Sequence, residues 1–281
     1  MKPYDLAFSL GFSCGASTAL RAAGLQHESY PLDWIGSPGI VPSAKMIAAN
    51  FDGWFEKEDL RLYDIRRGGF DKHVYLNART QFGFPHDFSS FIGFDAAYPE
   101  IREKYERRAA RFLARADAAR RMLAVFVEFP VKTRAPAGEL EEARRVLKER
   151  FPQAEIDLLY FHEDPTAPKP RAESAGESIT AVALDYRQME RGEVMHTLRH
   201  EGIARYLREN VAVNDTRTEA EKRAYAERKT ARRDARWGRG PFVTRLLNRW
   251  SYRLYRKLEK RLVDQGLVPW EGPLWFVRFD K

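Results

Sequence analysis

The most restrictive feature of the sequence is a helix-like segment enclosed by two apolar segments. "MLAVFVEF" at residues 122–129 and "AEIDLLYF" at residues 154–161 have the length and apolar content of buried strands. Between them, "AGELEEARRVLKERF" carries Glu and Arg around an apolar stripe, as a surface helix does. A helix that joins two such strands is typical of a βαβ unit in a parallel sheet.

Other segments extend this pattern. Further helices are expected at residues 17–23, 43–50, 99–120 and 196–210, and further strands at 4–10, 60–65, 72–77 and 178–184. The stretch "PTAPKPRAESAGES", rich in Pro and Ser, predicts a surface loop at 165–178. We therefore expect an α/β domain over residues 1–215, with three layers, a mostly parallel sheet and helices on both faces.

Positive charge is concentrated towards the end of the chain. The formal net charge is +8, and residues 219–261 alone hold 15 Lys and Arg against 5 Asp and Glu. The rest of the chain is therefore slightly negative. We predict a second, basic helical region over 216–281. It comprises an exposed helix at 217–236, an amphipathic helix at 242–262 and a terminal strand at 273–279.

The basic helix at 242–262 allows three interpretations. Its apolar stripe, which includes Trp250 and is flanked by arginines, suits the plane of an anionic membrane surface. Its charge would also attract nucleic acid, but no recognised nucleic-acid motif accompanies it. The plain alternative is packing against its own domain or a second protomer. If this helix were the working surface, the chain would be a non-catalytic binding protein.

Composition and the absence of apolar runs limit the remaining classes. The single cysteine, Cys14, excludes an internal disulfide framework and a Cys-rich zinc site. No apolar run approaches the ~20 residues that span a bilayer, and the opening residues lack the pattern of a secretory signal. We expect a cytoplasmic protein, peripheral at the inner membrane surface if 242–262 binds lipid. No metal-ligand motif or Gly-rich phosphate loop indicates a metal or cofactor.

Cys14 stands where the first predicted strand turns into the first helix. Ligands of doubly wound α/β folds bind outside the carboxyl ends of the strands, and the N-terminus of a helix lowers the pKa of a thiol. The backbone N–H groups of Cys14 and Gly15 could hold an oxyanion, and Gly11 would let a substrate approach closely. Ser9 is a further substrate-binding candidate. The alternative is a buried, inert thiol.

A thiolate nucleophile also needs a base within hydrogen-bond reach in the fold, and that base is normally a histidine. His86 in "FGFPHDFSS", followed directly by Asp87, is the first candidate. His162, which ends a predicted strand, is the second.

Five segments carry a resemblance to a known family: "SLGFSC", "LRAAGLQHESYPLDWI", "FPHDF", "YPEIREKYERRAARF" and "AVFVEF". In this order, over residues 5–165, they resemble a bacterial family described as papain-like cysteine peptidases, otherwise a domain of unknown function. The family pattern is S-L-G-x-x-C, P-F-D-W, an H-D pair and K-Y-x-R-R-x-x-R-F. This sequence has Leu32 in place of the Phe in P-F-D-W, an exchange of one apolar residue for another.

The resemblance implies that Cys14 is the nucleophile and His86 the base, with Asp33 or Asp87 orienting the imidazole. The arrangement also resembles SGNH-like hydrolases and the cysteine-bearing acyltransferase-like enzymes of bacterial capsule polysaccharide loci. Both readings use thiolate attack on an acyl carbon, a covalent thioester, and transfer to water or a sugar hydroxyl. The expected substrate is therefore a peptide, acyl or glycan compound.

Two further groups of residues have competing interpretations. Arg107 and Arg108 belong to a set of cations on one helix that could grip a phosphate or carboxylate of a substrate, or could form a solvated face with the interleaved glutamates. Trp34, Trp54 and the phenylalanines between residues 82 and 94 could line a sugar-stacking cleft, or could belong to the core.

Overall fold

The computed structural model gives the architecture of most of the chain before residue 228. The described residues are 3–66, 72–89, 92–128, 135–167, 169–185, 197–215 and 217–227. The chain divides into two compact units, Met1–Arg66 with Lys72–Asn214, and Arg67–Asp71 with Asp215–Lys281. In the second unit, residues 219–227 are helical. The basic helix expected at 242–262 and the strand expected at 273–279 lie outside the described residues, and the boundary expected at 215 stays a prediction.

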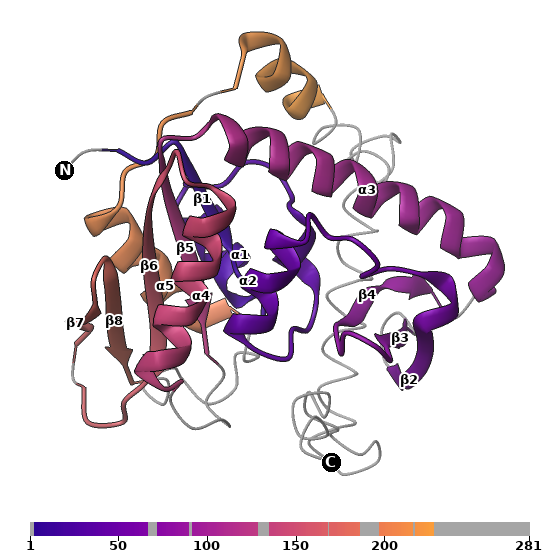
Figure 1. Ribbon diagram of the computed structural model, residues 1–281, viewed down its shortest axis with the longest axis horizontal. Coiled ribbons are helices and arrows are strands. Elements are labelled where there is room, and N and C mark those ends of the chain that lie inside the picture. The colour runs from indigo at the N-terminus through magenta and orange to yellow at the C-terminus, as the bar shows by residue number, and fades with distance from the viewer. Residues whose placement is uncertain are drawn as a thin grey trace, which may run out of the picture. The chain divides into compact units, whose positions relative to one another are not determined.

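The main sheet of the first unit has five strands in the order β1-β5-β6-β8-β7 (Figure 1). Four of them, β1 (Leu6–Ser9), β5 (Arg121–Val127), β6 (Glu155–Glu163) and β8 (Ile179–Leu184), run parallel. The expected α/β fold with a mostly parallel sheet is confirmed, and so is the βαβ unit. The apolar runs made these strands recognisable, because a strand buried on both faces needs apolar side chains throughout.

The fifth strand, β7 (Arg171–Gly176), lies at the sheet edge and pairs antiparallel with β8. The prediction of a surface loop at 165–178 was wrong for this segment. Its residues are exposed or only partly buried. The segment therefore lacks the alternation of apolar and polar residues by which a strand is recognised in a sequence. Ser178, at φ 54°, completes the turn that returns the chain to β8.

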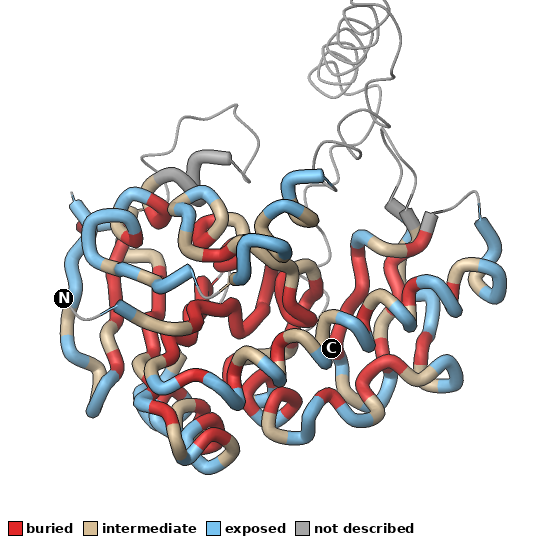
Figure 2. Tube along the Cα trace, turned by 90° about the horizontal axis from the view of Figure 1, so that it is seen from above, coloured by how far each residue is buried: buried red, intermediate tan, exposed pale blue. Residues whose placement is uncertain are grey.

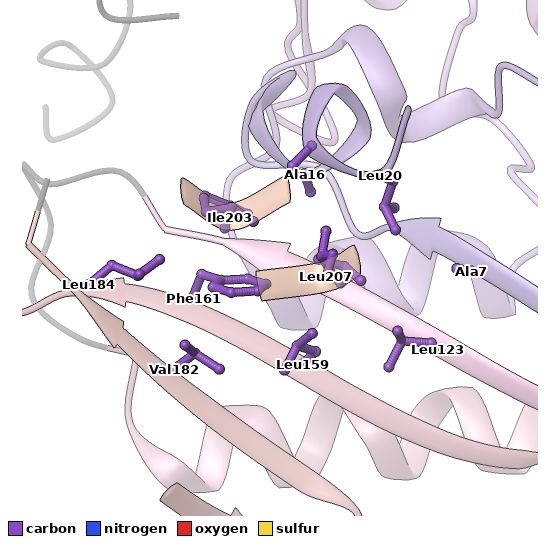
Figure 3. Packing of buried hydrophobic residues seen from close by; sticks show 13 residues of the cluster. Ala7, Ala16, Leu20, Leu123, Leu159, Phe161, Val182, Leu184, Ile203 and Leu207 are labelled. Atoms are coloured by element: carbon purple, nitrogen blue, oxygen red, sulfur yellow. The ribbon is translucent and has the colours of Figure 1, made fainter. Parts of the chain in front are cut away.

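One face of the main sheet is covered by α1 (Gly15–Ala22) and α5 (Thr197–Asn210), which pack on each other. Ile203 and Leu207 of α5 lie over the strands beside Phe161 (Figure 3). All three side chains are fully buried. This cluster fixes α1 against the sheet, and therefore fixes the turn that precedes α1.

The opposite face carries α2 (Ile40–Ala48) and α4 (Ala137–Arg150), which pack together in front of the sheet in Figure 1. Leu140, Ala143 and Leu147 form the buried stripe of α4. The described part of the chain thus has helices on both faces of the sheet. No helix within that part is long and apolar enough to cross a membrane.

Between α2 and β5 the chain forms a second, antiparallel sheet and a long helix. The sheet has the order β2 (Leu60–Arg66), β3 (Lys72–Asn77) and β4 (Gly83–Ser89). Helix α3 (Phe94–Ala118) follows it and alternates between buried and exposed residues along its length (Figure 2). Phe112 of α3 packs edge-on against Phe8 of β1, with 5.1 Å between ring centroids.

Most of the aromatic side chains considered for a sugar-stacking cleft form the core of this sheet. Trp54, Phe82, Phe84 and Phe88 are each at most 4% exposed. Trp54 packs edge-on against Phe84 at 5.6 Å, and the rings around it continue this contact network. The cleft interpretation is wrong for these four residues. Trp34 differs from them, because it is only partly buried.

Candidate active site

The turn after β1 has an unusual backbone conformation. Gly11 has φ +82° and Phe12 has φ +69°, and the second value is rare for a bulky residue. Phe12 is buried and packs edge-on against Phe126 of β5 at 5.8 Å, so side-chain packing holds the strained backbone in place. Ser9 is buried too, and its hydroxyl accepts a hydrogen bond from the Gly11 N–H at 3.0 Å. The structure therefore places Ser9 as a support of the turn.

Cys14 occupies the N-cap position of α1. Its carbonyl accepts the first helical hydrogen bond, from the Thr18 N–H at 2.9 Å, and its side chain is partly exposed. The first N–H groups of a helix have no acceptor within the helix, and the dipole at this end favours an anion. Cys14 therefore lies directly before the backbone donors of the first helical turn.

The backbone N–H of Gly15, expected as an oxyanion donor, donates to the Ser13 hydroxyl at 3.2 Å. An incoming oxyanion would have to compete with that hydroxyl. The N–H groups of Ala16 and Ser17 also belong to the first helical turn, where no preceding helical carbonyl is available to them.

The turn is tied to the loop that contains Asp33 and Trp34. The Ser17 hydroxyl donates to the Asp33 carbonyl oxygen at 2.6 Å and also lies 3.1 Å from the Cys14 carbonyl oxygen. This loop includes the 3₁₀ helix η1 (Pro31–Trp34). The loop and the first turn of α1 are therefore joined directly by this hydrogen bond.

The carboxylate of Asp33 closes its own loop. It accepts hydrogen bonds from the Tyr30 backbone N–H at 2.8 Å and the Gln26 amide at 2.9 Å, and it pairs with Arg21 at 3.4 Å. Asp33 is fully buried, and burial raises its pKa above the ordinary value although the Arg21 charge acts in the opposite direction. The hydrogen bonds and the ion pair of this carboxylate are thus made with Arg21, Gln26 and Tyr30.

Trp34 packs against the candidate base. Its ring stands perpendicular to the His86 imidazole, with 6.5 Å between centroids and an interplanar angle of 87°. The Arg21 guanidinium covers the same indole at 5.6 Å from the centroid. Arg21 therefore joins the buried Asp33 to the aromatic ring beside His86.

A bulge in β4 presents His86. One residue of β3, Val74, lies opposite residues 85–87, so β4 carries extra residues at this point. Phe84 and Phe88 on either side are buried, whereas His86 is exposed. Bulges re-aim side chains and are common next to active sites. This one takes His86 out of the aromatic core and turns it towards Trp34.

Asp87 points into the protein instead. Its carboxylate accepts a hydrogen bond from the buried Tyr105 hydroxyl at 2.5 Å and pairs with Lys104, both on α3. Burial lowers the pKa of Lys104 even though the Asp87 charge acts against that effect. The structure therefore places Asp87 as an anchor of the bulge. It acts on the position of His86 through the backbone.

Three arginines of α3, Arg107, Arg111 and Arg115, lie in two different environments. Arg107 is exposed and pairs with Glu103 on the same helix, as a solvated face predicts. Arg111 and Arg115 face inwards and share Glu28, which is only 13% exposed. The solvated-face interpretation is wrong for these two residues, and Arg108 is discussed below.

The second candidate base lies elsewhere. His162 is 5% exposed, belongs to β6 and stacks on Tyr160 with 5.4 Å between centroids. Strand β5 separates β6 from β1, whose end leads to Cys14. His162 thus lies on a strand that is not adjacent to β1, whereas His86 packs against Trp34, whose loop is hydrogen-bonded to the first turn of α1.

The segments that meet at this site coincide with a family match. A family model of unknown function described as "Putative papain-like cysteine peptidase" matches residues 5–151, which include Cys14, Asp33 and His86. The chain belongs to this family. An uncharacterized protein, R408, of Acanthamoeba polyphaga mimivirus is 30% identical over 140 residues, 44% of this chain and 62% of the relative. The chain thus spans less than two thirds of that relative's length. No solved structure matches significantly.

Several residues within the papain-like family match were not recognised as site residues from sequence. Ser17 links the Cys14 turn to the Asp33 loop, and Tyr105 anchors Asp87. Arg21 contacts both Asp33 and Trp34. Ser17 lies three residues after Cys14, on the same side of the first helical turn, and this spacing is the one sequence signal that points to it. The contacts of Arg21 and Tyr105 depend on tertiary pairing.

The strained turn gives a first prediction within the family's S-L-G-x-x-C segment. Gly11→Ala should lower the free energy of unfolding by about 2 kcal/mol, because the left-handed backbone disfavours a side chain and the new Cβ would lie 3.2 Å from Ser37 Cβ. Gly24→Ala is the control. Gly24 has φ +76° but nothing within 4 Å of its Cβ position, so only about 1 kcal/mol should be lost. Urea denaturation measures both losses, and equal losses would contradict the close approach.

Proposed function

We propose that this chain is a cysteine-dependent acyl-group enzyme, a peptidase or amidase in which Cys14 is the nucleophile and His86 the base. The observation that carries the proposal is the packing of Trp34. The loop of Trp34 is hydrogen-bonded to the first turn of the Cys14 helix, and its ring contacts the imidazole that the β4 bulge presents. The family match over the same residues supports the peptidase reading.

The chemistry follows from these roles. His86 takes the proton of the Cys14 thiol, and the thiolate attacks the carbonyl carbon of an amide, forming a carbon–sulfur bond. N–H groups of the first turn of α1 stabilise the negative oxygen that results. His86 then returns the proton to the departing amine as the carbon–nitrogen bond breaks. A water molecule, deprotonated by His86, attacks the thioester. The carbon–sulfur bond then breaks, the acid leaves, and His86 returns its proton to the Cys14 sulfur.

A cysteine-dependent acyltransferase or esterase acting on surface polysaccharide is the second candidate. It is favoured by one observation, the position of Cys14 after the first strand of a mostly parallel sheet. The two functions share the thioester and differ in the acceptor that attacks it. An activated ester supplied with and without a sugar acceptor separates them, because a transferase forms the acylated sugar and a hydrolase forms only the free acid.

The proposal is tested by the rate at which iodoacetamide alkylates the single cysteine between pH 4 and 10. We expect fast alkylation of the folded protein with a midpoint well below the ~8.5 of an ordinary thiol. In His86→Gln the midpoint should rise, because the thiolate has lost its cationic partner. His73→Gln, on β3 of the same small sheet, is the matched control and should leave the midpoint unchanged.

Two results would count against the proposal. Alkylation that occurs only when the protein unfolds in urea would make Cys14 a packing residue. An unshifted midpoint in His86→Gln would remove the histidine from the mechanism. Mass spectrometry of the alkylated chain gives an unambiguous signal, since the sequence contains one cysteine.

A further inference from the structure

Arg108 belongs to α3, the helix that contacts both segments carrying Trp34 and His86. Helix α3 contacts both η1 and β4, and these two elements also contact each other. The Arg108 guanidinium lies 5.4 Å from the centre of the Tyr105 ring, whose hydroxyl binds Asp87. Its charge also opposes the effect of burial on the pKa of Asp33. Arg108 therefore belongs to the same group of charges as Asp33, which precedes Trp34, and Asp87, which follows His86.

The neighbouring cations have acidic partners. Arg21 pairs with Asp33, Lys104 with Asp87, and Arg111 and Arg115 with Glu28. Within the described part of the chain, Arg108 forms no ion pair and no hydrogen bond, and its Nη1 atom is buried. A partly buried guanidinium is costly unless its N–H groups are satisfied, and the Tyr105 ring offers it only a cation–π contact.

The carboxylates near Arg108 are already engaged. Asp33 binds Gln26, Tyr30 and Arg21, and Asp87 binds Lys104 and Tyr105. The ion pairs at this junction join four cations to three carboxylates, and Arg108 adds a fifth positive charge. Among these groups positive charges outnumber carboxylates, and Arg108 is the cation without a carboxylate partner in the described part of the chain.

We infer that Arg108 binds an anionic group of the substrate, a carboxylate or a phosphate, next to the Trp34–His86 pair. A guanidinium presents parallel N–H donors that match two oxygens of such a group. The inference rests on the proposed function and narrows its substrate class to compounds that carry an oxyanion near the acyl carbon that Cys14 attacks. Arg107, the adjacent residue in the sequence, has no such role because it is exposed and paired with Glu103.

Two alkylating reagents of nearly equal shape test the carboxylate form of the inference. Iodoacetate carries a carboxylate where iodoacetamide carries a neutral amide, and both react with the single cysteine. The rate with iodoacetate divided by the rate with iodoacetamide should fall about tenfold in Arg108→Gln, because one hydrogen-bonded charge pair is lost. In Arg108→Lys this ratio should fall less, because lysine keeps the positive charge but lacks the paired N–H donors of the guanidinium. Arg107→Gln removes the same charge one residue away and should leave the ratio unchanged.

A second arm uses inorganic phosphate and does not depend on the thiol. Phosphate should raise the thermal midpoint of the wild type and of Arg107→Gln, and should raise that of Arg108→Gln by clearly less. If both reagents fail to alkylate folded protein while phosphate discriminates the variants, the proposed function fails and the anion site stands. If the folded protein is alkylated but neither the rate ratio nor the phosphate effect changes in Arg108→Gln, the anion site is overturned and the cation–π contact alone accounts for Arg108.

Discussion

Asp87→Ala should lower the free energy of unfolding by about 3 kcal/mol. The substitution leaves the partly buried Lys104 ammonium without its carboxylate and the buried Tyr105 hydroxyl without its acceptor. A urea denaturation curve measures the loss as a shift of the midpoint at unchanged slope. Glu103→Ala is the control, because it breaks an exposed pair with Arg107 on the same helix and should cost less than about 1 kcal/mol.

The pH dependence of the Asp87→Ala loss identifies its cause. Burial already lowers the pKa of Lys104, and removal of the opposing carboxylate lowers it further. Between that lowered pKa and the ordinary value of about 10.4, the unfolded chain binds more protons than the folded one, so stability rises with pH. Asp87→Ala should therefore recover part of its stability at alkaline pH. Recovery should also follow in the Asp87→Ala/Lys104→Met double variant, and a double variant no more stable than the single one would contradict a role for the buried charge.

Asp33→Ala should lower the free energy of unfolding by about 4 kcal/mol, more than Asp87→Ala does. Three donors, the Tyr30 N–H, the Gln26 amide and the Arg21 guanidinium, lose an acceptor that is completely buried. Asp117→Ala breaks a surface pair with Arg150 and should cost less than about 1 kcal/mol. Comparable losses in the two variants, measured by urea denaturation, would mean that the Asp33 network contributes little.

The conservative variant Asp33→Asn tests the buried charge separately. Burial raises the pKa of Asp33, so the folded state holds this proton more tightly than the unfolded chain. The stability that the protonated form contributes is present at low pH and is lost as the pH rises through the raised pKa. The advantage of the wild type over Asp33→Asn should therefore shrink from pH 4 towards neutrality. A constant difference would mean that Asp33 ionises normally in the folded protein.

The parallel strands could be predicted from the sequence because their burial leaves a local trace. Strands β5 and β6 consist mainly of buried apolar residues, and the helix between them carries its charges on one side. Strand β7 leaves no such trace, since its side chains are mostly at the surface. Sequence reasoning therefore recovered the centre of the sheet and missed its polar edge.

The candidate site was predictable at the level of segments and not at the level of contacts. Cys14 at a strand-to-helix turn follows from local patterns, but the adjacent residues His86 and Asp87 suggested a direct pair. The β4 bulge turns one outwards and the other towards α3. The local sequence does not predict this bulge, because its length depends on how β4 pairs with β3.

The two adjacent arginines of α3 show the same limit. Consecutive residues of a helix point about 100° apart, so one of the pair faces solvent while the other reaches the protein interior. Which of them does so depends on the rotation of α3, and that rotation is set by buried residues such as Tyr105 and Phe112. A motif that contains both arginines cannot by itself assign the inward position.

The loop of Trp34 and the strand of His86 are joined by two reciprocal backbone hydrogen bonds. The Gly36 N–H donates to the Gly83 carbonyl, and the Gly83 N–H donates to the Gly36 carbonyl, each at 2.8 Å. Because one separation breaks both bonds, the two amides become accessible to solvent deuterium in the same opening event. Their exchange rates therefore give a direct, ligand-free readout of how often the two halves of this site come apart.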